Sequence, residues 1–495
     1  MPANKKLKQL KGKRGKLKSE SRYLIKEFFS RFGNLLTQAV CKPGRNTVLL
    51  PYRLIQLIFL GINYLMKRLV LSVSFRRRQL QQIQEAMSHK DWLGAYKLMQ
   101  NCNMSFETRI NLASMLPLLE HGSMNEGIPQ WGTRWKQASP DRRVLMVVPK
   151  DFAGSMYKLA EAVNRYTAYA VRLIAFDFHE FSYPVDLVVP ECDDARLEAV
   201  FKLASEAAIF HLKDEYSWFL ALERLPNLGL LNDLFFSNKF PHTPKVFTHY
   251  GGYARKFKED AEYIARVQQF DGRIAMTPDL NFDWFNGSYI PHTIDTDTIL
   301  ESWRDSNILA HSPSNPTTKA TSLFRRAVSV IREHHQDVWH NWSVDIIHGV
   351  SYDECMRRKS KASLFFDQAG GHSEGPLGIS DVIGWYGNSA IEAMAFGIPT
   401  IAHLSEVACE RAGKAGCPVR DIPVINVPRT CDGLVEAILS FAMQSHQERK
   451  ALSERTRQFA VEFHGYKAVG ERMAQLYDEL LRQRNAPKEE HERKK

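Results

Sequence analysis

The sequence predicts an α/β protein with two tandem Rossmann-like domains, preceded by a basic, amphipathic helical extension. Three observations support this. Short apolar runs of strand length alternate with segments of helical periodicity from Arg143 onward. The alternation restarts after a break near residues 291–306, and basic residues gather before residue 80. Strands that alternate with helices are typical of parallel sheets covered by helices on both faces.

Length and composition limit the number of domains and the class of protein. A chain of 495 residues and 56.8 kDa is long enough for two or three domains. Its 44% hydrophobic and 24% charged residues are ordinary globular usage and exclude wholesale disorder. Seven cysteines, an odd number without C-x-x-C spacing, argue against a disulfide framework and a structural zinc. We therefore expect a cytosolic protein or one on the cytosolic side of a membrane.

The net charge is concentrated at the N-terminus. Residues 1–80 hold 19 Lys and Arg against two acids, or +17, so the remainder carries 11 − 17 = −6. Within this arm, residues 54–66 are free of charge, which is shorter than the roughly 20 residues that a membrane span needs. The pattern predicts an amphipathic helix that binds an anionic membrane surface, which makes the protein peripheral on the inner face of the cell membrane. A helix packed on the body remains an alternative. The lack of a known nucleic-acid motif argues against a nucleic-acid partner.

The first domain follows a helical segment and linker at residues 81–141 and spans residues 142–298. Its first strand, residues 143–149, is a continuous apolar run that ends at a proline, which is typical of a buried parallel strand. The further strands are predicted at residues 171–176, 186–190, 207–211, 245–249, 273–277 and 288–291.

The second domain spans residues 299–470, and residues 471–495 form a C-terminal helix and charged tail. Strands are predicted at residues 307–311, 343–349, 363–367, 399–403 and 423–428. Helices are predicted between them at residues 321–334, 352–360, 389–396 and 432–443, and a last helical stretch at residues 448–484. Two such domains place ligands at the carboxyl ends of both sheets.

The most informative segment is residues 384–403, GWYGNSAIEAMAFGIPTIAH. Gly387 precedes a helix that carries Glu392, so the amides of Gly387, Asn388 and Ser389 would point at a bound anion. A carboxylate such as that of Glu392 suits a ribose diol because it accepts two hydrogen bonds. On the residues alone, a solvated glutamate between two glycine turns remains an alternative.

This segment resembles the signature of retaining GT-B glycosyltransferases, the glycosyl transferases group 1 family. Residues 289–297, 311–321 and 346–368 resemble that family's inter-domain turn, its phosphate-binding loop and the unit leading to its donor loop. The resemblance covers roughly residues 143–481.

The resemblance implies a nucleotide-sugar donor held by the second domain. Glu392 would hold the ribose, and Lys319 would neutralise the diphosphate leaving group. Gly387 would let the backbone approach the diphosphate. Further hydrogen bonds to phosphate would come from Ser312, Ser314, Asn388 and Ser389.

The sequence departs from the family pattern at three places. Gly384 stands where the family has a glutamate that contacts the sugar, with Asp367, Glu374 or Asp381 as substitutes. Ala320 stands where the family has a glycine, and the arginine expected before Lys319 is missing.

The first domain offers candidates for the acceptor side. His249 follows a strand in a segment that resembles the family's cleft-facing H-G segment, and it is the catalytic candidate there. His211 ends another strand. For both, a hydrogen-bonded structural histidine is an equal alternative. Asp151, Gly154 and Ser155 lie in the loop after the first strand.

We therefore expect a metal-independent glycosyltransferase that transfers a hexose-type sugar with retention to a cell-surface glycan or lipid-linked acceptor, as in polysaccharide or lipopolysaccharide biosynthesis. The nucleotide sugar is a co-substrate, and no cofactor or metal is expected. The D-x-D letters at residues 295–297 fall in the inter-domain turn. Two alternatives stay open, a nucleotide-sugar epimerase and a non-catalytic nucleotide-sugar binding protein.

Overall fold

The structure is a computed structural model that describes residues 81–82, 85–86, 127–177, 185–189, 194–213, 225–249, 251–369 and 384–485. The chain divides into two compact units, Met1–Gln81 and Gln82–Lys495. The predicted basic arm at residues 1–80, and most of the helical segment and linker after it, lie outside the described residues.

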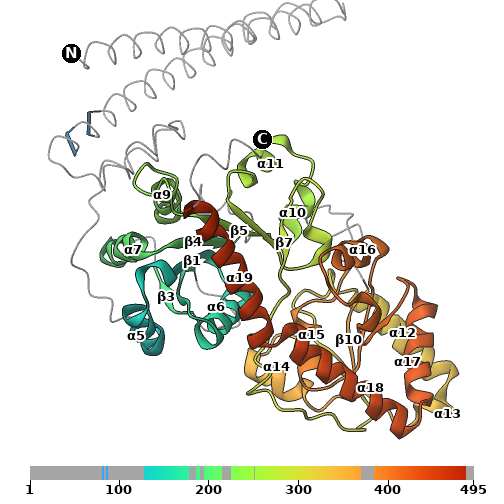
Figure 1. Cartoon of the computed structure of the whole chain (residues 1–495). Coiled ribbons are helices and arrows are strands. Elements are labelled where there is room, and N and C mark those ends of the chain that lie inside the picture. The colour runs from blue at the N-terminus through green and yellow to red at the C-terminus, as the bar shows by residue number, and fades with distance from the viewer. Residues whose placement is uncertain are drawn as a thin grey trace, which may run out of the picture. The chain divides into compact units, whose positions relative to one another are not determined.

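The fold class is confirmed, because two parallel sheets lie one after the other along the second unit (Figure 1). The first sheet has seven strands in the order β3-β2-β1-β4-β5-β6-β7. All its recorded pairings are parallel, with β1 between β2 and β4. Its strands are β1 Arg143–Lys150, β2 Ala170–Asp177, β3 Leu187–Val188, β4 Ile209–Lys213, β5 Lys245–His249, β6 Gly272–Ala275 and β7 Ser288–Tyr289.

The second sheet has five parallel strands in the order β12-β11-β10-β8-β9. Its first strand, β8, lies between β9 and β10. A strand order that reverses direction at the first strand is typical of doubly wound domains, which bind ligands at that point. Its strands are β8 Ile308–His311, β9 Ser343–Ile346, β10 Leu364–Gln368, β11 Thr400–Ala402 and β12 Val424–Asn426.

Helices connect the strands in both domains. Those of the first domain are α5 Pro129–Gln137, α6 Ser155–Tyr166, α7 Asp194–Glu206, α9 Pro226–Phe235, α10 Gly252–Lys256 and α11 Ala261–Val267. Those that follow are α12 Thr321–His334, α13 Gln336–Trp339, α14 Tyr352–Lys359, α15 Asn388–Ala395, α16 Glu406–Lys414, α17 Cys431–Met443, α18 His446–Phe459 and α19 Tyr466–Asn485. Side-chain caps explain several starts. Ser445 and Glu448 form a reciprocal capping box at α18, for example.

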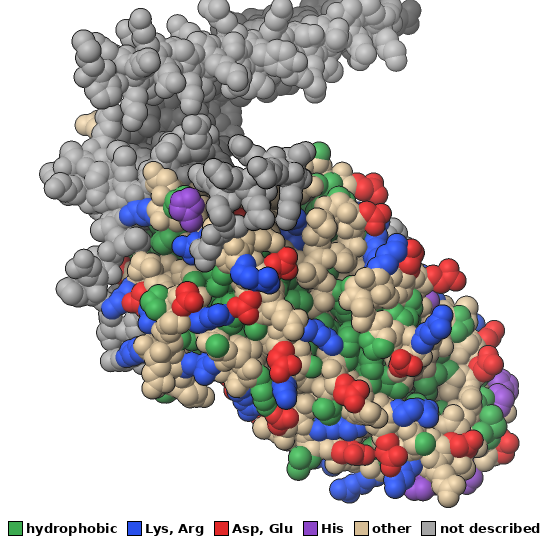
Figure 2. All heavy atoms as spheres, in the orientation of Figure 1, with side chains coloured by type: hydrophobic (Ala, Val, Ile, Leu, Met, Phe, Trp, Pro, Cys, Tyr) green, Lys and Arg blue, Asp and Glu red, His purple; other side chains and the backbone are tan. Residues whose placement is uncertain are grey.

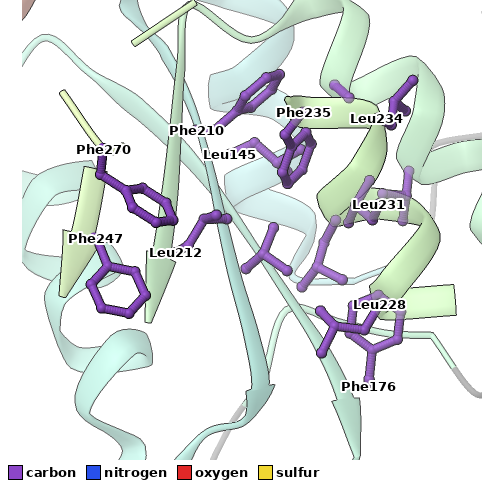
Figure 3. Close-up of a cluster of buried hydrophobic side chains, with 14 of the residues drawn as sticks. Leu145, Phe176, Phe210, Leu212, Leu228, Leu231, Leu234, Phe235, Phe247 and Phe270 are labelled. Carbon is purple, nitrogen blue, oxygen red and sulfur yellow. The ribbon is translucent and has the colours of Figure 1, made fainter. Parts of the chain in front are cut away.

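The first sheet buries apolar side chains on both faces. On one face, Leu145 and Phe210 pack with Leu231 and Phe235 of α9 (Figure 3). The rings of Phe210 and Phe235 are stacked with their centroids 4.0 Å apart. Burying such side chains contributes roughly 1.5–3 kcal/mol each, which explains why strands that are apolar on both faces form at these positions.

The C-terminal helix α19 belongs to the core of the first domain, although it follows the second domain in sequence. It packs along α6 and buries Val469, Met473 and Tyr477 against the other face of the first sheet. It is separated from α18 by a π-helical turn, Ala460–His464, so the predicted helix at residues 448–484 is interrupted there. The chain therefore crosses between the domains twice.

On the face that Figure 2 shows, basic and acidic side chains are interspersed over the described part of the unit. Among the described residues, no helix is both long enough and apolar enough to cross a membrane.

Candidate functional site

A cavity of about 290 Å³ lies where the carboxyl ends of both sheets meet. Residues after β1, β5, β6 and β7 line it from the first domain, represented by Ala153, Gly251, Thr277 and His292. Residues after β8, β9 and β10 line it from the second domain. The cavity therefore occupies the position at which doubly wound sheets bind their ligands.

All seven residues predicted for the donor side line this one cavity. They come from the loop after β8, from the start of α12 and from α15. They are Ser312, Ser314, Lys319, Gly387, Asn388, Ser389 and Glu392. The separate segments on which the family resemblance rests are thus brought together by the fold.

An acidic side chain connects Lys319 to the start of α15. Lys319 Nζ donates to Asp367 Oδ1 at 3.0 Å, and the backbone N–H of Gly387 donates to Asp367 Oδ2 at 2.7 Å. Asp367 is buried at the end of β10. An ammonium and a helix-terminal amide therefore converge on one carboxylate, which is the arrangement that also binds a phosphate oxygen.

Glu392 is not a solvated helix residue. Its side chain is buried, and its carboxylate accepts from Lys158 Nζ at 3.0 Å and from Lys359 Nζ at 2.7 Å. Lys158 lies on α6 of the first domain and Lys359 ends α14 of the second, so this ion-pair cluster joins the two domains. Lys359 also donates to the carbonyl and hydroxyl oxygens of Ser389.

The charges around Glu392 fix its protonation state. Burial alone raises the pKa of this carboxyl, but the two neighbouring ammonium groups and their hydrogen bonds outweigh burial and lower the pKa to about 2. The carboxylate is thus charged at neutral pH. Among the residues that line the cavity, Arg255 and Lys319 are basic and Glu392 is acidic, so the lining has one positive charge in excess.

Neither predicted histidine of the first domain lines the cavity. The ring nitrogens of His211 bond the hydroxyls of Tyr477 at 2.7 Å and Thr248 at 2.6 Å. Burial, followed by the charge of Lys213, lowers the pKa of His211 to about 3. His211 therefore matches the structural alternative and ties β4 to α19.

His249, the predicted catalytic residue of this domain, is fully buried among aromatic rings. Its ring stacks on Phe285 at 3.8 Å between centroids, and its Nε2 lies 3.2 Å from the hydroxyl of Tyr263. Burial lowers its pKa to about 3. A neutral core histidine in this position is a packing residue, so the prediction that it contacts substrate is not supported by its position.

The three predicted residues of the loop after β1 act at the start of α6. Asp151 accepts from the N–H groups of Met156 at 3.0 Å and Tyr157 at 2.9 Å. Lys213 donates to Ser155, and Gly154 has a φ of 59°. Their neighbour Ala153 is the loop residue that lines the cavity.

The structure bears on two of the three departures from the family pattern, Gly384 and Ala320. A Cβ at Gly384 would lie 2.1 Å from the hydroxyl oxygen of Ser405, so the backbone packs where only glycine fits. Ala320 has a φ of 55°, the left-handed conformation that favours glycine. Of the proposed substitutes for the missing glutamate, Asp367 is engaged by Lys319 and Gly387, while Glu374 and Asp381 lie outside the described residues.

Sequence reasoning missed the partners of the predicted residues. Lys158 and Lys359 were not singled out; Lys158 stands among apolar residues of its helix, which is a usable signal, whereas Lys359 follows two arginines and offers none. Arg255, Thr277 and Gln368 were also missed, and all three line the cavity. The described residues contain no group of three His, Cys, Asp or Glu side chains that would hold a metal ion.

The cavity thus brings Lys319, which is paired with Asp367, together with several hydrogen-bonding side chains between two Rossmann-like domains. Neither a known protein family nor a curated protein matches the sequence.

Several solved glycosyltransferases are similar to the chain. An alpha-glucosyltransferase solved with UDP and a 13-mer DNA has 11% identity and a TM-score of 0.48, covering 68% of this chain and 99% of that chain. HepE from Anabaena, solved with UDP-glucose, has 11% identity and a TM-score of 0.47, with the same coverage of 68% and 99%. TarM from S. aureus, solved with UDP, has 13% identity and a TM-score of 0.39, covering 55% of each chain.

Proposed function

We propose that the protein is a nucleotide-sugar-dependent glycosyltransferase, with the donor held mainly by the second domain. The observation that carries this proposal is the convergence of Lys319 Nζ and the Gly387 N–H on the two oxygens of the Asp367 carboxylate beside the start of α15. The excess positive charge of the cavity favours a ligand with at least one anionic group, and a diphosphate fits that requirement.

The chemistry follows from this placement. Lys319 and the amides at the start of α15 stabilise the negative charge that grows on the leaving diphosphate. By the family resemblance, transfer retains the anomeric configuration, and the leaving phosphate assists deprotonation of the acceptor. Closure of the two domains over the bound donor limits the access of water that would hydrolyse it.

Glu392 has a second role besides the binding of a ribose that the resemblance implies, because it also bonds lysines of both domains. Each of its carboxylate oxygens already accepts from one lysine. A carboxylate has about four acceptor positions, so hydroxyl groups of a ribose still find room beside the lysines. Glu392 therefore serves donor binding and domain contact together.

The test is isothermal titration of the full chain with nucleoside diphosphates and nucleotide sugars, comparing wild type with Lys319→Met. We expect one nucleotide to bind and the variant to lose about tenfold or more in affinity, because a charge-assisted hydrogen bond contributes about 1.5–3 kcal/mol. Lys361→Met, at an exposed lysine of the same domain, is the matched control. Absence of binding by every nucleotide refutes the donor site.

A glycan or lipid-linked acceptor beside an anionic membrane, with residues 1–80 as the attachment, completes the proposal. Its support is the charge of +17 in that segment and its apolar helical pattern. Recovery with anionic vesicles should fall when residues 1–80 are deleted. Equal recovery of both forms contradicts the attachment.

A glycine at position 384 is also compatible with a second function, which is nucleotide-sugar binding without turnover. Because Gly384 packs on Ser405, no carboxylate can occupy that position. Product analysis separates the three functions. A glycosylated acceptor indicates transfer, a free sugar isomer indicates epimerisation, and an unchanged donor across a panel of acceptors indicates binding alone.

A further inference from the structure

Two buried polar atoms, each on a residue that lines the cavity, have no hydrogen-bond partner among the described residues. They are Oε1 of Gln368, whose residue is 0% exposed, and Oγ1 of Thr277, whose residue is 8% exposed. Gln368 ends β10 of the second domain, and Thr277 lies two residues beyond β6 of the first. Leaving such atoms unpaired is costly, and because both residues line the cavity, a ligand there is the candidate partner.

The orientation of the Gln368 amide is fixed by its other end. Its Nε2 donates to the backbone carbonyl of Trp385. A flipped amide would place two oxygens in contact, so the atom left over is the oxygen, which accepts hydrogen bonds and does not donate them. It therefore disfavours phosphate or carboxylate and favours a ligand hydroxyl or N–H.

The position of Gln368 relates it to the anion site. Gln368 directly follows Asp367, the residue that accepts from Lys319 and from the Gly387 N–H. Gln368 is tied to Trp385, which lies two residues before Gly387. Thr277 supplies a hydroxyl that both donates and accepts from the facing domain. A neutral group attached to a phosphate, and rich in hydroxyls, has the chemistry to satisfy both.

We propose that Gln368 and Thr277 form a hydroxyl-binding subsite for the sugar ring of the donor. The inference rests on the proposed function and deepens it. The packing of Gly384 against Ser405 agrees with it, because a side chain at position 384 is excluded and the sugar hydroxyls need other partners. One subsite residue comes from each domain, so the sugar can bind both residues only when the two domains lie on opposite sides of it.

The test separates the sugar from the nucleotide. Isothermal titrations give the dissociation constants of a nucleoside diphosphate and of its hexose conjugate. The ratio of the two constants is the affinity that the sugar adds. In Thr277→Val and Gln368→Met we expect the hexose conjugate to bind about tenfold more weakly, with the affinity for the nucleoside diphosphate unchanged. Thr277→Ser should retain the wild-type ratio, and Thr298→Val, at an exposed threonine, is the control.

Each outcome has a distinct reading. Thr277→Val removes an atom without a partner, so it should fold as well as wild type and keep the test valid if Gln368→Met does not fold. An unchanged ratio in Thr277→Val overturns the inference. A loss confined to a methyl glycoside, titrated as an acceptor against protein loaded with the nucleoside diphosphate, overturns the assignment to the donor sugar. Failure of wild type to bind any nucleoside diphosphate refutes the proposed function instead.

Discussion

Replacing Glu392 by glutamine should destabilise the protein strongly at neutral pH. The carboxylate lies 3.0 Å from Lys158 Nζ and 2.7 Å from Lys359 Nζ, and the side chain is only 8% exposed. A pKa lowered from 4.5 to about 2 corresponds to about 3 kcal/mol of folding free energy. Breaking a buried ion pair typically costs about 3–5 kcal/mol, which agrees. We therefore expect the free energy of unfolding to fall by about 3 kcal/mol.

The pH dependence of stability is an independent test of the contribution of Glu392 to folding. The folded pKa lies below the unfolded value, so this stabilisation is present above pH 4.5 and is lost as the pH falls toward 2. Between pH 5 and pH 3 the stability difference between wild type and Glu392→Gln should shrink by about 2 kcal/mol.

The assay is urea denaturation of both proteins at pH 7, 5 and 3, followed by fluorescence. A matched variant tests the mechanism, because Lys158→Met should destabilise wild type but restore stability to Glu392→Gln by removing an unopposed buried ammonium. A loss below about 1 kcal/mol at pH 7, or a difference that stays constant with pH, refutes the reasoning. The result also matters for binding work, since weak nucleotide binding by a Glu392 variant would then have a structural cause.

Three further predictions concern two glycines with close neighbours and one buried hydrogen bond. Gly387→Ala places a Cβ 3.0 Å from Lys319 Nζ, so titration should show about tenfold weaker nucleotide binding with near-normal thermal unfolding; wild-type affinity contradicts this. Gly384→Ala collides with Ser405 at 2.1 Å and should lower stability by about 1–3 kcal/mol in urea denaturation, with recovery in a Ser405→Gly background. Tyr477→Phe removes a 2.7 Å bond to the buried histidine of β4, and the same assay should show a loss of about 1–3 kcal/mol; an unchanged midpoint speaks against that bond.

The sequence predicted the two-sheet architecture well because buried parallel strands leave a plain signal. The run at residues 143–149, for example, is apolar on both faces of its strand and became β1. The return of α19 to the first domain was not predicted, because an amphipathic helix shows only that it has a buried face. Its partner surface, where Tyr477 meets His211, is set by contacts far apart in sequence.

Some residues of the candidate site could be predicted from the sequence and others could not, for a similar reason. Gly387 and its neighbours form a local motif, and local motifs can be read along the chain. The lysines that engage Glu392 come from two other helices, so only the fold reveals them. The histidine at position 249 shows a further limit of local reading, since a polar residue at a strand end can be buried in an aromatic core.

The return of α19 has a consequence for how the protein forms during synthesis. Domains usually fold in the order in which they leave the ribosome. Here the first domain lacks Met473 and Tyr477, part of its own core, until the chain beyond residue 466 has been made. The second domain, from β8 to α18, is one continuous stretch and is complete earlier. The order of folding should therefore reverse the order of synthesis, which protease protection of ribosome-bound chains stalled after residue 300 and after residue 460 would measure. Early protection of the first domain would contradict it.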